Sequence, residues 1–459
     1  MKRIEKFLVN TVILVVTSLF IRTISMFFDI YIAKKIGSEA IGLFGLIMSI
    51  YFFAITVANS GIGLAATRIV AEELAINRQT GAKIAIKKCL IYSLFFGISA
   101  GLILCFLANF ICETVLHNKV QSNILYAISI SLPFSSMCSS LNGYFIGVKR
   151  VSKNSLYDIF NTFLKIGFTF ILFDILKSNN ISTSCFILII ANTSAEILSF
   201  IYLYILYLID KKTLKNTRTS NIDYLQRVLK ISIPVAITSY IRSGLSTIKH
   251  FLIPLRLEKY GMSCENALSS YGLINGMAMP LLLFPGLIIN SISSLLIPEF
   301  ARYNTKHDFK RMNEVINTMF SFTIVFSNFV IGIYLYFNKE LALFTYQNIQ
   351  IANYLLLLGP LLLFMYLDHV TDAILKGIDK QVGVMYCNII DLIFSILLLY
   401  ILLPIYGIMG YILILYMSEI FNFSVSIYQL HKATHFSFDY IKRTAITNDQ
   451  SVNYNYHYE

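Results

Sequence analysis

Charged residues are scarce in this chain. Asp, Glu, Lys and Arg make up only 14% of its 459 residues, whereas hydrophobic residues make up 56%. Soluble globular domains carry about 25% charged residues, so the composition excludes a soluble domain and predicts an integral membrane protein. The formal charge of +12 does not indicate nucleic-acid binding, because membrane proteins accumulate Lys and Arg in their cytoplasmic loops.

Motifs for ATP hydrolysis and metal binding are absent as well. The sequence holds no G-x-x-x-x-G-K-[ST] phosphate loop, no H-E-x-x-H motif and no C-x-x-C pair among its seven cysteines. Most of these cysteines lie in apolar runs, where a thiol behaves as a small core residue. We therefore expect no metal site and no resident cofactor. The short predicted outer loops also argue against a membrane enzyme.

What the sequence has in abundance is long apolar runs. Each is long enough to cross about 30 Å of hydrocarbon, and spans without an alternating barrel pattern must be helices. The sequence thus predicts an all-α membrane protein with about twelve transmembrane helices. Their expected positions are residues 8–33, 41–61, 90–112, 123–147, 155–176, 184–209, 231–253, 271–297, 315–337, 350–375, 383–404 and 407–430.

The two halves of the chain repeat each other. "TSLFIR" (17–22) lines up with "TSYIR" (238–242), and "DIFNTFLKI" (158–166) lines up with "NIIDLIFSI" (388–396). An even number of helices per half gives both copies the same orientation, so we predict two lobes in a parallel pseudo-twofold repeat. The expected division is a six-helix lobe (1–209), a cytoplasmic linker (210–230), a second six-helix lobe (231–435) and a polar cytoplasmic tail (436–459).

Loop charge predicts the orientation. With a cytoplasmic N-terminus, most of the 37 Lys and Arg residues fall in inside segments, as the positive-inside rule requires. Both termini are therefore expected in the cytoplasm. Two repeated lobes around a midplane cavity favour a transporter that works by alternating access.

Polar stripes interrupt two of the apolar helices. Ser18, Arg22, Ser25 and Asp29 follow one another at helical spacing in the first span, and so do Thr238, Arg242, Ser246 and Lys249 in the seventh. An arginine at a bilayer centre costs about 2.5–3.5 kcal/mol, so both stripes should face the space between the lobes.

These stripes allow two interpretations. Arg22 and Arg242 occupy equivalent positions in the repeats, which favours a substrate or gating role, while Asp29 could instead hold them in inter-lobe salt bridges. Further candidates for coupling or inter-lobe pairing inside the spans are Asp158, Lys165 and Asp391. Because a guanidinium matches phosphate oxygens, the substrate-cavity set (Arg22, Arg242, Lys249, Ser18, Ser25 and Ser246) predicts an anionic cargo.

Several segments resemble a known family. "IAKKIGSEAIGLFGL" (32–46), "GIGLAATRIVAEELA" (61–75), "LNGYFIGVKR" (141–150), "LLIPEFAR" (295–302) and "LKGIDK" (375–380) are similar to the stage V sporulation protein B group. This group contains polysaccharide-transport members of the multidrug/oligosaccharidyl-lipid/polysaccharide (MOP) flippase superfamily.

The resemblance implies a MATE-like flippase in the bacterial cytoplasmic membrane. Its expected cargo is an undecaprenyl-linked anionic saccharide, either a lipid II-like peptidoglycan precursor or a polysaccharide repeat unit. Export could be driven by the membrane potential or by coupled H+ or Na+. Membrane lipids and cell-wall synthesis proteins are the expected partners, without nucleic acid. Related peptidoglycan-precursor flippases have fourteen helices, and the extra pair is not found here.

Two other functions stay open from sequence. A cation-coupled multidrug exporter of the same superfamily would need an acidic ion site, which Asp29, Asp158 or Asp391 could supply. A non-transporting scaffold or enzyme in cell-wall synthesis is the other alternative.

Overall fold

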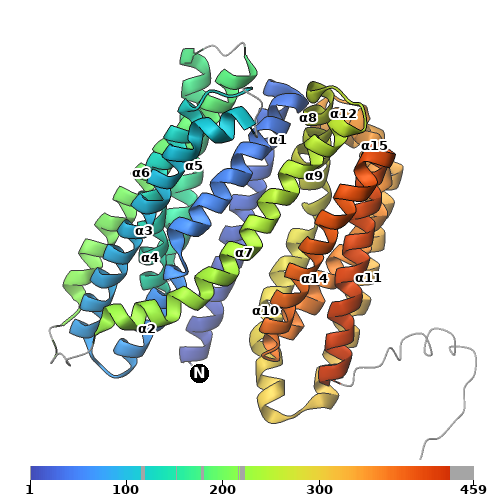
Figure 1. Cartoon of the computed structure of the whole chain (residues 1–459). Coiled ribbons are helices and arrows are strands. Elements are labelled where there is room, and N and C mark those ends of the chain that lie inside the picture. The colour runs from blue at the N-terminus through green and yellow to red at the C-terminus, as the bar shows by residue number, and fades with distance from the viewer. Residues whose placement is uncertain are drawn as a thin grey trace, which may run out of the picture. The chain divides into compact units, whose positions relative to one another are not determined.

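The protein is a helical bundle. The structure, a computed structural model, describes residues 2–114, 119–150, 152–176, 180–215, 217 and 223–434, with the backbone alone for residues 2–16. In this part of the chain every regular element is a helix and none is a strand (Figure 1). The predicted all-α class is therefore confirmed. The predicted tail (436–459) and part of the predicted linker (210–230) lie outside the described residues.

The first half of the chain forms six long or medium helices. Helix α1 (Lys2–Asn59) contains one non-helical residue, Gly37, with φ 82° and ψ 173°, so it consists of two consecutive segments. Only glycine adopts this backbone conformation readily, which explains why the chain reverses there. The others are α2 (Ile62–Ala75), α3 (Gln79–Thr114), α4 (Asn123–Gly147), α5 (Ser152–Leu176) and α6 (Ile181–Thr213).

The second half of the chain is divided into more and shorter helices. It begins with α7 (Tyr224–Lys259), and its last helix, α15 (Gln381–Thr434), again contains one non-helical glycine, Gly407. Between them lie α8 (Cys264–Tyr271), the π-helix η1 (Gly272–Ala278), α9 (Met279–Leu283), α10 (Gly286–Lys306), α11 (Phe309–Tyr336), α12 (Asn338–Tyr346), α13 (Gln350–Leu358), the 3-10 turn η2 (Gly359–Leu361) and α14 (Leu362–Gly377).

Length and composition make this a multi-pass membrane protein. Eight of the described helices are long and apolar enough to cross a membrane, or nine if the pair Cys264–Leu283 and Gly286–Lys306, bent by 61°, counts as one broken span. This count treats Thr17–Ala75 and Gln381–Thr434 as single candidates, although each contains a glycine break. The number of twelve crossings stays a prediction.

Contacts group the chain into two compact units. Unit 1 comprises Met1–Phe284, Asn338–Leu355 and Leu392–Ile414, and unit 2 comprises Pro285–Phe337, Leu356–Asp391 and Leu415–Glu459. The boundaries proposed for the two six-helix lobes concern the sequence repeat and stay a prediction.

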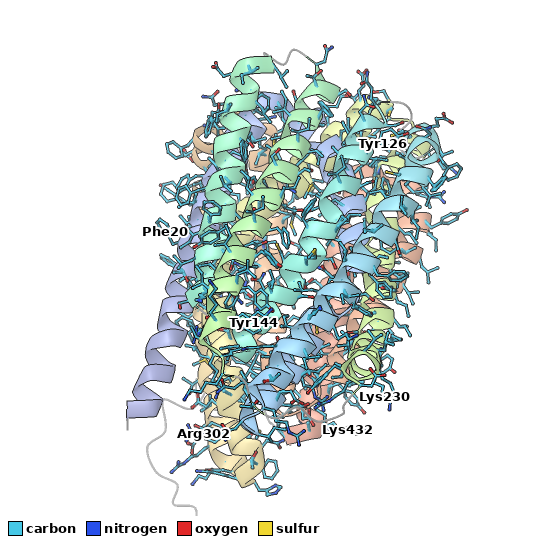
Figure 2. The ribbon with its side chains drawn as sticks, turned by 90° about the vertical axis from the view of Figure 1, so that its left-hand side faces the viewer. Phe20, Tyr126, Tyr144, Lys230, Arg302 and Lys432 are labelled. Atoms are coloured by element: carbon cyan, nitrogen blue, oxygen red, sulfur yellow. The ribbon has the colours of Figure 1, made fainter. Side chains whose placement is uncertain are left out.

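The core of unit 1 lies where α2, α3, α4 and α6 meet. Tyr144 of α4 is fully buried there, and its ring lies 5.2 Å from that of Tyr207 of α6. Figure 2 shows Tyr144 within the bundle, whereas Phe20 of α1 lies on its outer flank and is 54% exposed. Apolar side chains on an outer flank are typical of a lipid-facing surface.

Candidate functional site

Arg22 and Arg242 lie on two helices of unit 1. Arg22 belongs to the first segment of α1, and Arg242 lies midway along α7, which contacts the second segment of α1 (Figure 1). Both side chains are exposed. Among the described residues no carboxylate lies within salt-bridge distance of either guanidinium. Neither guanidinium is therefore neutralised by a described acidic side chain.

One face of α7 is fixed against the second segment of α1. Thr247 donates to the carbonyl of Ser49 over 3.1 Å, and Tyr240 donates to the carbonyl of Val57 over 3.2 Å. Helical periodicity turns Arg242 away from this face, because it stands two residues after Tyr240. The arginine is thus not part of the packing between α7 and the second segment of α1.

The other members of the predicted stripes are partly accessible. Ser18 is exposed, while Ser25, Ser246 and Lys249 are half-buried. The Lys249 ammonium donates to the Ser395 hydroxyl of α15 over 3.2 Å. Hydroxyl and ammonium groups therefore accompany the two arginines along their helices. Their part in substrate binding stays a prediction.

The four residues predicted for coupling or inter-lobe pairing are divided between the two units, three in unit 1 and one in unit 2. Asp29 of α1 and Asp158 of α5 are exposed, and neither forms a salt bridge within the described chain. Lys165 of α5 is close enough to interact electrostatically with both Asp29 and Glu196. Asp391 lies in unit 2, where its carboxylate accepts a hydrogen bond of 2.6 Å from Ser418.

Sequence reasoning missed an ionic cluster that joins α2 to α7. Arg227 at the start of α7 donates to Glu72, and to Glu73 over 2.9 Å, while Tyr224 donates to Glu73 over 3.1 Å. The Glu73 side chain is only 1% exposed. Both glutamates lie between the predicted spans 41–61 and 90–112, so hydropathy gave no signal for this contact.

It also missed a pocket in unit 1. A cavity of about 890 Å³ lies against α2, α4 and α5. Its lining residues are Asn59, Gly63, Leu64, Thr67, Arg68, Ala71, Ser135, Cys138, Ser139, Asn142, Gly143, Ile146 and Tyr157. They come from four helices, and residues so far apart in sequence form no pattern that could have predicted a pocket.

The comparisons with known proteins agree with this architecture. The family model described as "Polysaccharide biosynthesis protein" matches residues 7–304, and the MatE model matches residues 260–401. Among curated proteins, stage V sporulation protein B of Bacillus subtilis (strain 168) is 23% identical over 415 residues, covering 88% of this chain and 80% of the relative. Sporulation protein YkvU of the same organism is 20% identical, covering 87% and 88%.

Solved structures share the fold. An inward-facing multidrug resistance MATE family transporter of the MOP superfamily superposes with a TM-score of 0.70 at 13% identity, covering 94% of this chain and 96% of that one. A MOP superfamily transporter from Pyrococcus furiosus Vc1 (DSM3638) gives a TM-score of 0.60 at 14% identity, covering 93% and 96%. The predicted resemblance and MATE-like fold are therefore confirmed. Since the first family model spans well over half of the sequence, the chain belongs to the polysaccharide biosynthesis protein family.

Proposed function

We propose that this transporter is a flippase for an undecaprenyl-linked anionic saccharide. The cargo would be a lipid II-like precursor or a polysaccharide repeat unit, carried to the outer face of the bacterial cytoplasmic membrane by alternating access. Membership of a polysaccharide biosynthesis family supports a saccharide cargo, and the sporulation names of the two curated relatives are in keeping with a role in cell-wall synthesis.

The observation that carries this proposal is the pair of uncommitted guanidinium groups. Arg22 is exposed on an apolar helix, and Arg242 is exposed on α7, which is not among the candidate membrane spans by length and composition; no described carboxylate neutralises either of them. A lone arginine at membrane depth costs free energy unless it meets water or an anion. A pyrophosphate offers several charged oxygens to the planar guanidinium fork, which binds them more strongly than it binds neutral acceptors.

The membrane potential favours export of an anionic cargo. An inside-negative membrane potential assists outward movement by about 2.3 kcal/mol per negative charge per 100 mV. Coupling to H+ or Na+ through Asp29, Asp158 or Asp391 is a second possible source of energy and can be tested by imposing gradients.

The test is flipping of fluorescent lipid II by purified protein in proteoliposomes. Replacing Arg22 or Arg242 with Ala should slow flipping by about 10- to 100-fold, as expected when a charged hydrogen bond of about 1.5–3 kcal/mol is lost. Lys310→Ala serves as the control, since Lys310 is an exposed cation on another helix, α11.

The outcomes separate the candidate functions. Unimpaired flipping by both alanine variants would refute the phosphate-binding role of the arginines. Proton-driven movement of cationic dyes, without flipping of lipid II, would favour the multidrug exporter instead. Movement of neither compound would favour a protein that acts in cell-wall synthesis without moving these cargoes.

A further inference from the structure

A charged pocket lies at the turn between α10 and α11 in unit 2. Its cavity of about 140 Å³ is lined by Glu299, Arg302, Tyr303, Lys306, Asp308 and Arg311. The connection between the two helices is only His307 and Asp308, and His307 ends α10 in the left-handed conformation, with φ 54°. This short turn brings side chains from the end of α10 and the start of α11 around one cavity.

The pocket lies at the polar end of two apolar helices. By length and composition α11 is a candidate membrane span, and α10 is the second part of the bent candidate span. Farther from the turn both helices expose large apolar side chains, such as Leu295 of α10 and Phe329 of α11. Arg302, labelled in Figure 2, lies close to the turn. A turn that joins two spans lies at the membrane surface, where the lipid headgroups are.

The two carboxylates of the pocket already have partners. Glu299 accepts a hydrogen bond of 2.8 Å from the hydroxyl of Tyr303. Asp308 accepts one of 3.3 Å from the backbone N–H of Arg311 and lies 3.5 Å from the Nε of the same residue. These contacts fix both acidic groups beside the cavity, where they disfavour a ligand of high negative charge.

The remaining two cations are not neutralised. Arg302 and Lys306 are exposed, and among the described residues no carboxylate lies within salt-bridge distance of either. They stand four residues apart on α10, and like charges at this spacing repel each other on a helix. A bound anion removes this repulsion. The planar guanidinium can bind two phosphate oxygens at once, and the ammonium adds a point charge.

Size and charge together limit the ligand. A cavity of about 140 Å³ is smaller than the about 300–1,000 Å³ of pockets that enclose a drug-sized molecule, so it suits a single small group. Three cations against two carboxylates leave a small positive excess. A phosphodiester with one negative charge matches this excess better than a pyrophosphate does.

We propose that this pocket binds the phosphodiester headgroup of an anionic phospholipid of the surrounding membrane, with Arg302 and Lys306 as its direct contacts. Basic pockets between transmembrane helices at the cytoplasmic face are suited to anionic headgroups, and the distribution of Lys and Arg predicts that this turn is cytoplasmic. The inference goes beyond the proposed function, because the ligand is a constituent of the bilayer and not the cargo.

The first experiment compares two phospholipids. Native mass spectrometry of detergent-purified protein measures the affinities for phosphatidylglycerol, which is anionic, and phosphatidylcholine, which carries the same phosphodiester beside a cation. The parent protein should prefer phosphatidylglycerol. Arg302→Gln and Lys306→Gln should each lower its affinity by about tenfold and leave that for phosphatidylcholine unchanged. The unchanged ligand also shows that the variants are folded. No preference in the parent protein would overturn the proposal.

Lys310→Gln is the matched control. Lys310 lies in the first turn of α11 and is exposed at the same end of the hairpin, but it does not line the cavity. Its replacement removes the same charge as Lys306→Gln and should leave the affinity for phosphatidylglycerol unchanged. Equal losses in the two variants would show attraction to the basic turn as a whole and refute the pocket.

A second experiment separates a membrane lipid from a soluble anion. The thermal unfolding midpoint is measured in phosphatidylcholine nanodiscs after addition of phosphatidylglycerol or of inorganic phosphate. Phosphatidylglycerol should raise the midpoint, Lys306→Gln should reduce that rise, and phosphate should have no effect because it lacks the chains that hold a headgroup at the surface. An equal rise with phosphate would refute the lipid as ligand. Neither experiment measures flipping, so both outcomes are independent of the proposed function.

Discussion

At the scale of single residues, Asp210 near the end of α6 is a buried charge with three hydrogen-bonding partners. Its side chain has no solvent exposure, and its carboxylate accepts hydrogen bonds from Arg150, from Lys153 over 2.7 Å and from Tyr144 over 2.9 Å. A carboxylate this deeply buried is stable only because its partners are in place. Asp210 therefore anchors the turn between α4 and α5 to α6.

Removing this charge should destabilise the protein. Asp210→Asn leaves Arg150 and Lys153 side by side without a neutralising partner, and we expect the free energy of unfolding to fall by about 3–5 kcal/mol. The measurement is the thermal unfolding midpoint of detergent-purified protein. Asp174→Asn, which changes an exposed aspartate of α5, should stay within about 0.5 kcal/mol of the parent. Equal midpoints for the two variants would contradict the anchoring role.

Gly37 gives a second prediction at this scale. A Cβ at Gly37 would meet nothing within 4 Å, so Gly37→Ala tests the backbone conformation alone and should destabilise by about 1–3 kcal/mol. Gly167 of α5 also has open space around its Cβ but is helical, so Gly167→Ala should stabilise by about 0.5–1 kcal/mol. Unfolding midpoints that move in the same direction would refute the argument.

At the scale of helices, the ionic cluster between α2 and α7 is the clearest specific contact. Arg227 forms an ion pair with Glu73, whose side chain is 1% exposed, and a second ion pair with Glu72. Near the middle of α7, Tyr240 donates to Ser60, in the turn between α1 and α2, over 2.8 Å. Helix α7 is thus held by ion pairs at its start and by a neutral hydrogen bond near its middle.

Mutating this cluster should reveal energetic coupling between its members. We expect Arg227→Met to lower stability by about 3–5 kcal/mol, because it leaves Glu73 buried and charged without a cation. The double variant Glu73→Gln with Arg227→Met should recover part of the loss. A double-mutant cycle on unfolding free energies measures the coupling, and additive effects would show that the pair does not interact.

Helix positions were largely predictable, whereas helix ends and breaks were not. Hydropathy placed the span at 123–147, and α4 occupies Asn123–Gly147. Yet α3 begins at Gln79 rather than near residue 90, because a helix can continue beyond the apolar layer that hydropathy detects. The predicted span 271–297 includes the break between α9 and α10, where Pro285 precedes the new helix.

The candidate site, too, was only partly predictable from the sequence. Arg22 and Arg242 could be found because charge inside an apolar helix is conspicuous, and the structure finds both exposed. The pocket beside α2 and α4 is different, because its lining residues are a mixture of small, polar and apolar types that no sequence pattern sets apart. Only their packing gives them a shared cavity, and a single sequence carries no information on that packing.

At the scale of the whole molecule, the orientation in the membrane can be tested. The distribution of Lys and Arg predicts cytoplasmic termini. A green fluorescent protein fused at the C-terminus should therefore be fluorescent, and alkaline phosphatase fused there should be inactive. Alkaline phosphatase inserted at 261–263, between α7 and α8, should be active. The opposite pattern of activities would reverse the orientation.

The composition of unit 1 has a consequence for biosynthesis. Its segments extend from the first helix to Ile414, and they skip two stretches that belong to unit 2. The ribosome must therefore deliver nearly the entire polypeptide before this unit has all of its parts. At about 5–20 residues per second, early helices wait many seconds in the bilayer with incomplete surroundings. During that interval Arg22, on an apolar helix, lacks part of its final surroundings, and a lone arginine at membrane depth costs free energy unless it meets water or an anion.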